Sequence, residues 1–205
     1  MTTYLVLGIT LGLAAGISPG PLLTLVILET IKHDRKEGIL VACSPLLTDL
    51  PIVLISLFIL LKFSDYSYIF GILSFLGAIY IGYLAFENIK QKGFKLDTQV
   101  LKAQSLKKGI ITNFLNPQPY LFWITIGVPT ILKGYQSGLN VSLCFVLGFY
   151  ICLVGSKIII AVIVEKTKTF LQSKFYILII RLLGFILLIF SAFLIKESLV
   201  HFNLL

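Results

Sequence analysis

The segment "GISPGPLL", residues 16–23, stands in the middle of the first long apolar stretch of the chain. Its first six positions hold two prolines and two glycines. Proline has no backbone N–H and its ring clashes with the preceding helical turn, so a regular helix does not continue through such a segment. We therefore expect two shorter helices with a break between them in this part of the chain.

Composition places this break inside a membrane. Of the 205 residues, 58% are hydrophobic and only 13% are charged, which is more apolar surface than a soluble domain of this size can bury. Six stretches carry at most one charge each and reach the roughly 20 residues that cross a bilayer core. They are residues 1–28, 38–61, 66–86, 109–132, 139–164 and 175–195. The sequence predicts an all-α integral membrane protein with six transmembrane helices in a single transmembrane domain, residues 1–205.

The basic residues indicate an orientation. The net charge is +8, and Lys and Arg gather in alternate connections, at residues 32–36, 90–108 and 166–174. Because cytoplasmic loops are enriched in Lys and Arg, we expect these connections to be cytoplasmic and both termini to face outward. The charge is thus explained by membrane topology, and we expect a lipid bilayer and no nucleic acid as partner. The first stretch lacks the basic start of a signal peptide, so we expect it to be a span.

The chain also contains an internal repeat. "SPGP" (18–21) in the first stretch has a counterpart in "NPQP" (116–119) in the fourth, and "FLGAIYIGYLAF" (75–86) resembles "LLGFILLIFSAF" (182–193). The second and fifth stretches carry one ionisable residue each. We predict two three-helix units, residues 1–88 and 109–205, joined by a basic cytoplasmic loop at 89–108. An odd number of spans per unit makes the repeat inverted.

Interrupted helices at matching positions of an inverted repeat are typical of transporter binding sites. Ser18 and Asn116 are favourable N-cap residues, and Pro19 and Pro117 suit the first helical position. The N–H groups that such a half-helix exposes attract anions, including a carboxylate. The alternative is that each break is a proline kink that serves packing alone.

Two charges fall inside predicted spans. A carboxylate at mid-membrane, such as Asp49, is costly unless it is paired, protonated or hydrated. We expect Asp49 to carry a proton or to bind a substrate ammonium, with a permanently paired structural aspartate as the alternative. Lys157 either snorkels toward the interface, pairs with Asp49, or faces a substrate carboxylate.

Three motifs carry a family resemblance: "GISPGP" (16–21), "LLTD" (46–49) and "NFLNPQPYLFW" (113–123). With these, the chain resembles the lysine exporter (LysE/RhtB-type) family of bacterial amino-acid exporters. The resemblance implies a secondary exporter of amino acids or similar small metabolites in the bacterial inner membrane, coupled to proton influx. Asp49 matches the acidic position of the family's second span and is our predicted proton carrier. The predicted substrate-binding residues are Ser18, Pro19, Gly20, Pro21, Asn113, Asn116, Pro117 and Lys157.

Other classes of protein remain open. A divalent-cation or other small-ion transporter of related architecture needs several hard oxygen ligands, and a single aspartate lies in the predicted spans. Thiol–disulfide electron carriers of the CcdA/DsbD type share the layout, with prolines beside reactive cysteines in spans one and four. Here Ser18 and Asn116 occupy those places, and Cys43, Cys144 and Cys152 lie elsewhere. A fourth alternative is a non-transporting scaffold.

Catalysis has little support in the sequence. It shows no paired carboxylates, zinc-ligand spacing or serine–base arrangement, so we expect neither an enzyme nor a cofactor nor a bound metal. Glycines in the spans, Gly77, Gly82, Gly148 and Gly155, suit close helix packing either within the chain or in a homo-oligomer.

Overall fold

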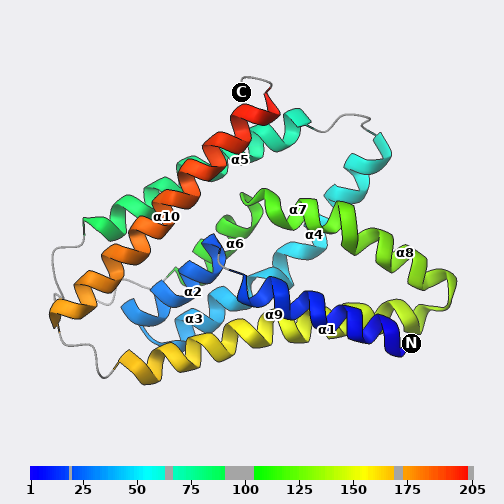
Figure 1. The fold of residues 1–205 in the computed structure, drawn as a ribbon, viewed down its shortest axis with the longest axis horizontal. Helices are drawn as coiled ribbons and strands as arrows, with labels where there is room; N and C mark the ends of the chain where they lie inside the picture. Colours follow the sequence, from blue (N-terminus) through cyan, green and yellow to red (C-terminus); the bar gives the residue numbers. More distant parts are fainter. Residues whose placement is uncertain (19, 63–66, 91–103, 169–172, 203–205) are drawn as a thin grey trace.

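The computed structural model describes residues 1–18, 20–62, 67–90, 104–168 and 173–202, and these residues form helices and no strand. Figure 1 shows their arrangement. The helices are α1 (Thr2–Ile17), α2 (Pro21–Lys32), α3 (Arg35–Ala42), α4 (Ser44–Lys62), α5 (Ser67–Ile89), α6 (Ser105–Phe114), α7 (Pro117–Phe122), the π-helical turn η1 (Trp123–Gly127), α8 (Val128–Gln136), α9 (Leu139–Lys168) and α10 (Ser173–His201).

Four continuous helical segments are long and apolar enough to cross a membrane: Arg35–Ser56, Gly71–Ile89, Leu139–Thr167 and Arg181–His201. Helices α1 and α2 meet at a bend of 61°, and together they count as a fifth span if the bent pair crosses the membrane once. The prediction of an all-α membrane protein is thereby confirmed. The fourth predicted span, residues 109–132, is divided among α6, α7, η1 and α8, each of ten residues or fewer. The six-span count and the inverted repeat therefore stay predictions.

The first break differs in detail from the sequence prediction. Ser18 is the C-cap of α1 and does not cap α2; Gly20 is the N-cap of α2, and Pro21 takes the first helical position. The reason is local, because a residue before proline is driven into extended backbone, and Gly20 has φ −166° and ψ 176°. Pro19 lies outside the described residues.

The second break follows the prediction closely. Asn116 is the N-cap of α7, and its side-chain oxygen accepts a hydrogen bond of 3.1 Å from the Gln118 N–H. Pro117 occupies the first helical position, as expected for a residue with no N–H to leave unpaired. Directly after α7 the backbone widens into the π-helical turn η1, a feature that often accompanies functional sites.

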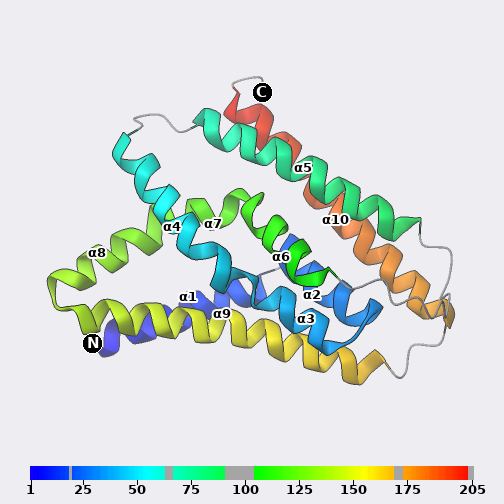
Figure 2. The same ribbon diagram turned by 180° about the vertical axis from the view of Figure 1, so that it is seen from behind.

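Two long helix pairs dominate the packing. Helix α1 lies along α9, and α5 lies along α10, as both ribbon views show (Figures 1 and 2). Glycines permit the close approach of α1 to α9. A Cβ atom at Gly8 would lie 2.3 Å from the carbonyl oxygen of Phe145, and one at Gly12 the same distance from that of Phe149.

The α5–α10 pair is joined by a hydrogen bond and approaches the second break. The Ser191 hydroxyl of α10 donates to the Ala78 carbonyl of α5 at 2.8 Å. On the same helix, a Cβ atom at Gly77 would lie 2.2 Å from the carbonyl oxygen of Leu115, the residue between α6 and the N-cap of α7. Glycine at position 77 thus lets α5 support the interrupted backbone directly.

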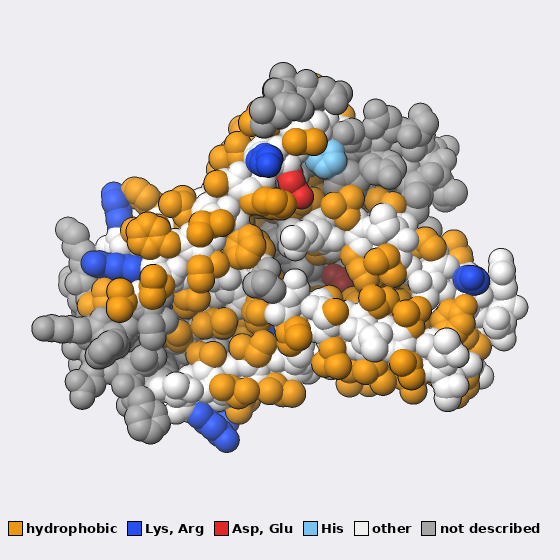
Figure 3. All heavy atoms as spheres, in the orientation of Figure 1, with side chains coloured by type: hydrophobic (Ala, Val, Ile, Leu, Met, Phe, Trp, Pro, Cys, Tyr) orange, Lys and Arg blue, Asp and Glu red, His pale blue; other side chains and the backbone are white. Residues whose placement is uncertain are grey.

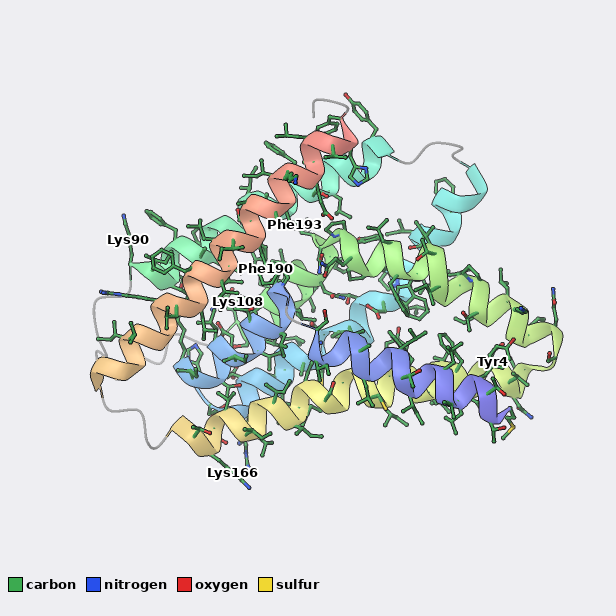
Figure 4. All side chains as sticks on the ribbon, in the orientation of Figure 1. Tyr4, Lys90, Lys108, Lys166, Phe190 and Phe193 are labelled. Atoms are coloured by element: carbon green, nitrogen blue, oxygen red, sulfur yellow. The ribbon has the colours of Figure 1, made fainter. Side chains whose placement is uncertain are left out.

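Basic side chains lie at both ends of the molecule (Figure 3). Lys90 and Lys166 lie at one end, and Tyr4 lies at the opposite end (Figure 4). Between them, hydrophobic side chains cover much of the face that Figure 3 shows. Lys90 and Lys166 belong to two of the predicted cytoplasmic connections and lie at the same end, while the outward orientation of the termini stays a prediction. Most of the predicted basic loop, residues 91–103, lies outside the described residues.

Candidate functional site

A cavity of about 190 Å³ lies where the two breaks meet. In Figure 3 the face is hollowed near its middle, and an acidic side chain is visible inside the hollow. The cavity collects residues from α1, α2, α4, α6, α7, η1 and α9. Its lining consists of Ala15, Ser18, Gly20, Pro21, Leu22, Leu23, Pro45, Asp49, Asn113, Asn116, Gln118, Pro119, Phe122, Trp123, Phe149, Leu153 and Lys157.

Most of the predicted site residues share this cavity. Those that line it are Ser18, Gly20, Pro21, Asp49, Asn113, Asn116 and Lys157. Pro117 is buried next to the cavity at the start of α7 but does not line it. The structure thus brings together residues from four separate stretches of sequence, although what each does in transport is not shown by their placement.

The N-terminus of α2 opens into the cavity without a side-chain cap. The Thr24 N–H donates to the Gly20 carbonyl at 3.0 Å and closes the first turn of the helix. The amides of Leu22 and Leu23 precede this bond, and both residues line the cavity. Such first-turn N–H groups, together with the positive end of the helix dipole, form a favourable environment for a carboxylate.

Lys157 reaches the other side of the same break. Its side chain is only 3% exposed, and its Nζ donates to the carbonyls of Gly16 at 2.8 Å and Ala15 at 3.1 Å. These carbonyls belong to the last turn of α1, the negative end of that helix. The snorkelling interpretation is therefore wrong. Nor is a Lys157–Asp49 pair among the ion pairs of the described residues.

Asp49 is buried and is held by donors from three elements. Its Oδ1 accepts from Asn113 Nδ2 of α6 at 3.1 Å. Its Oδ2 accepts from the Tyr150 hydroxyl of α9 at 3.1 Å and from Trp123 Nε1 of η1 at 3.4 Å. Asn113 was predicted from the sequence. The two aromatic donors were not, because tyrosine and tryptophan are common in membrane spans and neither lies near Asp49 in the sequence.

One side of the cavity is formed by a group of apolar side chains, here called the aromatic wall: Phe122, Trp123, Phe149 and Leu153. The rings of Phe122 and Phe149 stack with centroids 4.9 Å apart, and Trp123 meets Phe149 edge-on at 5.6 Å. These contacts fix the wall between η1 and α9. Apart from Asp49, the described lining of the cavity contains no carboxylate.

Away from the cavity, a buried ionic cluster joins α2 to the start of α6. Glu29 is 2% exposed; its carboxylate accepts from Lys108 Nζ at 2.8 Å and from the Ser105 hydroxyl, and His33 Nε2 lies 3.6 Å away. We call these four residues the Glu29 cluster. In the sequence Glu29 directly follows a long uncharged stretch, and nothing there distinguishes it from an ordinary charge at the end of a span.

A family model described as "LysE type translocator" matches residues 13–198. The matched part includes both helix breaks, Asp49 and Lys157. No curated protein and no solved structure matches the chain.

Proposed function

The chain belongs to the family of LysE type translocators, and from this premise we propose that it is a secondary exporter of an amino acid or a similar small metabolite, driven by proton influx. Family membership implies export of amino acids or other small molecules by a multi-pass membrane transport protein. The observation that carries the finer proposal is one small cavity in which an uncapped helix N-terminus, a buried lysine and a buried aspartate meet.

In the proposed complex, the substrate carboxylate lies at the α2 N-terminus near Lys157, and the ammonium lies at Asp49. Ser18, Asn113 and Asn116 add polar atoms to the lining, while Gly20, Pro21 and Pro117 form the helix starts at the two breaks. The volume of about 190 Å³ supports a small solute, because clefts for drug-sized ligands are typically about 300–1,000 Å³.

Proton coupling follows from competition at one carboxylate. Asp49 in its ionised form can hold the substrate ammonium, whereas protonation removes the charge that holds it. A proton entering from outside would therefore displace the substrate, and loss of that proton on the inside would restore the binding form. Ionisable residues inside membrane proteins commonly serve as such relays.

Alternating access is the proposed movement, with the two predicted three-helix units rocking around the cavity. The packing supports this scheme, since α5 and α10, the third helices of the two units, pair with each other. The helix ends before the two breaks each accept a side-chain hydrogen bond. Lys157 donates to carbonyls at the end of α1, and the Tyr120 hydroxyl donates to the Phe114 carbonyl at the end of α6, at 3.1 Å. A bacterial inner membrane and outward termini complete the proposal.

The cavity gives less support to the alternative functions. A cation transporter requires several oxygen ligands of high charge, and the described lining contains one carboxylate within an apolar and aromatic surface. A thiol–disulfide carrier requires a reactive cysteine at the site, and the described lining contains none of Cys43, Cys144 and Cys152.

Uptake into inverted membrane vesicles tests the proposed function. Vesicles that contain the protein are offered a pool of labelled amino acids, with and without an imposed proton gradient, acidic inside. We expect accumulation of one or a few amino acids that requires the gradient and is absent from vesicles without the protein. Accumulation that ignores the gradient would contradict proton coupling alone, and no accumulation of any amino acid would contradict amino-acid export.

A Tyr150→Phe variant should export about tenfold more slowly than the wild type. The change removes a hydrogen bond to Asp49 Oδ2 and keeps the ring against Trp123, whose centroid is 6.2 Å away. Hydrogen bonds to charged groups contribute about 1.5–3 kcal/mol, enough for an effect of this size. The measurement is the initial rate in the vesicle assay, with Tyr135→Phe on exposed α8 as the control. Equal rates for both variants would show that this hydrogen bond does not help to position Asp49 for transport.

A further inference from the structure

The polar groups of the cavity have little unused hydrogen-bonding capacity. A carboxylate offers about four lone-pair sites, and the donors Asn113, Trp123 and Tyr150 already take three of those on Asp49. About one acceptor position is left for a solute. Asp49 can therefore satisfy one ammonium group by a direct hydrogen bond, and a second ammonium on the same molecule would need another partner.

Lys157 is limited in the same way. Its ammonium has three N–H donors, and the carbonyls of Ala15 and Gly16 accept two of them. One donor is left for a solute, beside the first-turn amides of Leu22 and Leu23. The cavity thus offers one cationic place for a carboxylate and one anionic place for an ammonium.

The described lining contains no other charged side chain. Asp49 and Lys157 are the charged residues of the described lining, and both are buried. The aromatic wall supplies apolar surface beside them, and its stacked rings are held by contacts with one another. A solute side chain that lies on this wall leaves water without meeting a charged partner.

We propose, on the basis of the proposed function, that the cavity selects neutral amino acids with an apolar side chain and rejects basic and acidic ones. A zwitterion uses the one acceptor position of Asp49, the one donor of Lys157 and the α2 amides, and its side chain buries apolar surface on the wall. Lysine would place a second ammonium, and glutamate a second carboxylate, in a cavity whose described lining offers no further charged partner. An unpaired charge removed from water carries a large penalty.

The specificity-determining residues of this scheme are Phe149 and Leu153, both on α9 and both in the cavity lining. Leu153 is 7% exposed and lies one helical turn from Lys157, so that a side chain at position 153 lies within the same cavity as the bound solute. A carboxylate introduced there would supply the second partner that a basic side chain lacks.

The test compares labelled leucine, lysine and glutamate in the inverted-vesicle assay with the wild-type protein. We expect leucine to be accumulated at least about 100-fold faster than lysine or glutamate. If lysine or glutamate is accumulated within tenfold of the leucine rate, the selectivity proposed here is overturned and export of amino acids still stands. If none of the three is accumulated, and neither is any other amino acid, the proposed function fails and the inference fails with it.

A gain of function sharpens the comparison. Leu153→Asp should lower the leucine-to-lysine ratio at least about tenfold, whereas Leu153→Asn, of the same shape but uncharged, should not help lysine. The ratio is measured on protein that elutes as a folded species in detergent. A folded Leu153→Asp variant with an unchanged ratio would overturn the placement of the solute side chain on the aromatic wall. Should the variant not fold, the wild-type ratio alone decides the question.

Discussion

An Asp49→Asn variant is expected to lose gradient-driven export by at least about 100-fold. Asparagine has nearly the size of aspartate, and its carbonyl oxygen can still accept the hydrogen bond from the Tyr150 hydroxyl, while its NH2 group takes the place of the oxygen that accepts from Asn113. Because the volume is nearly unchanged, we expect the cavity to keep its shape. It can neither take up a proton at physiological pH nor compensate the charge of an ammonium. Both parts of the proposed cycle at this position are therefore lost together.

The measurement is the initial rate of uptake into inverted vesicles at two sizes of imposed proton gradient. Glu87→Gln is the matched control, because Glu87 pairs with Lys32 at 3.8 Å and its side chain is 45% exposed, outside the cavity lining. We expect the control to transport within about twofold of the wild type. Gradient-dependent accumulation that persists in Asp49→Asn would remove this residue from the coupling mechanism, whatever the substrate.

A Glu29→Gln variant is expected to lower the melting temperature of the protein by about 3–12 °C. Breaking a buried ion pair by removing one partner costs about 3–5 kcal/mol. The side chain of Lys108 is 24% exposed, so water compensates part of that loss and about 1.5–3 kcal/mol remains. In a protein of this length each kcal/mol shifts the melting temperature by about 2–4 °C. The carboxylate also faces the first turn of α6, where the helix dipole favours negative charge.

Two further variants identify the cause. Glu165→Gln removes the partner of Arg35 in a pair whose side chains are 33% and 58% exposed, and we expect it to shift the melting temperature by less than about 2 °C. Combining Glu29→Gln with Lys108→Met removes both charges and should recover part of the loss, as a double-mutant cycle would detect. If Glu29→Gln melts like Glu165→Gln, the Glu29 cluster does not stabilise the fold.

The two breaks could be predicted from the sequence because their causes are local. Proline and asparagine act on their own backbone neighbours, so Asn116 and Pro117 took the expected cap and first helical positions. Where two prolines lie within a few residues, as around Gly20, the same rules gave a wrong start for α2, two positions too early: Ser18 was predicted as the N-cap, and Gly20 is the N-cap. Asp49 and Lys157 line one cavity, as their similar places in the predicted repeat suggested.

Long-range contacts could not be predicted in this way. The bonds of Asp49 to Trp123 and Tyr150 join residues 74 and 101 positions apart, and no local pattern in the sequence marks them. The side-chain orientation of Lys157 could not be predicted either, because a lysine near the end of a span can reach the interface or the interior from the same backbone position. The π-helical turn arises where the fourth segment packs against its neighbours, and it divides a stretch that composition alone presents as one span.

The pairing of the helices also determines when each helix can meet its packing partner during synthesis of the chain. Helices α1 and α5 are synthesised in the first half of the chain, but their main packing partners are α9 (Leu139–Lys168) and α10 (Ser173–His201) in the second half. At roughly 5–20 residues per second, about 100 intervening residues take on the order of 5–20 seconds to make. For that time the glycine face of α1 has only lipid or another protein to cover it. The first half of the chain must therefore wait in the bilayer, and a truncated copy of it would present an unfinished surface to the cell's membrane quality control.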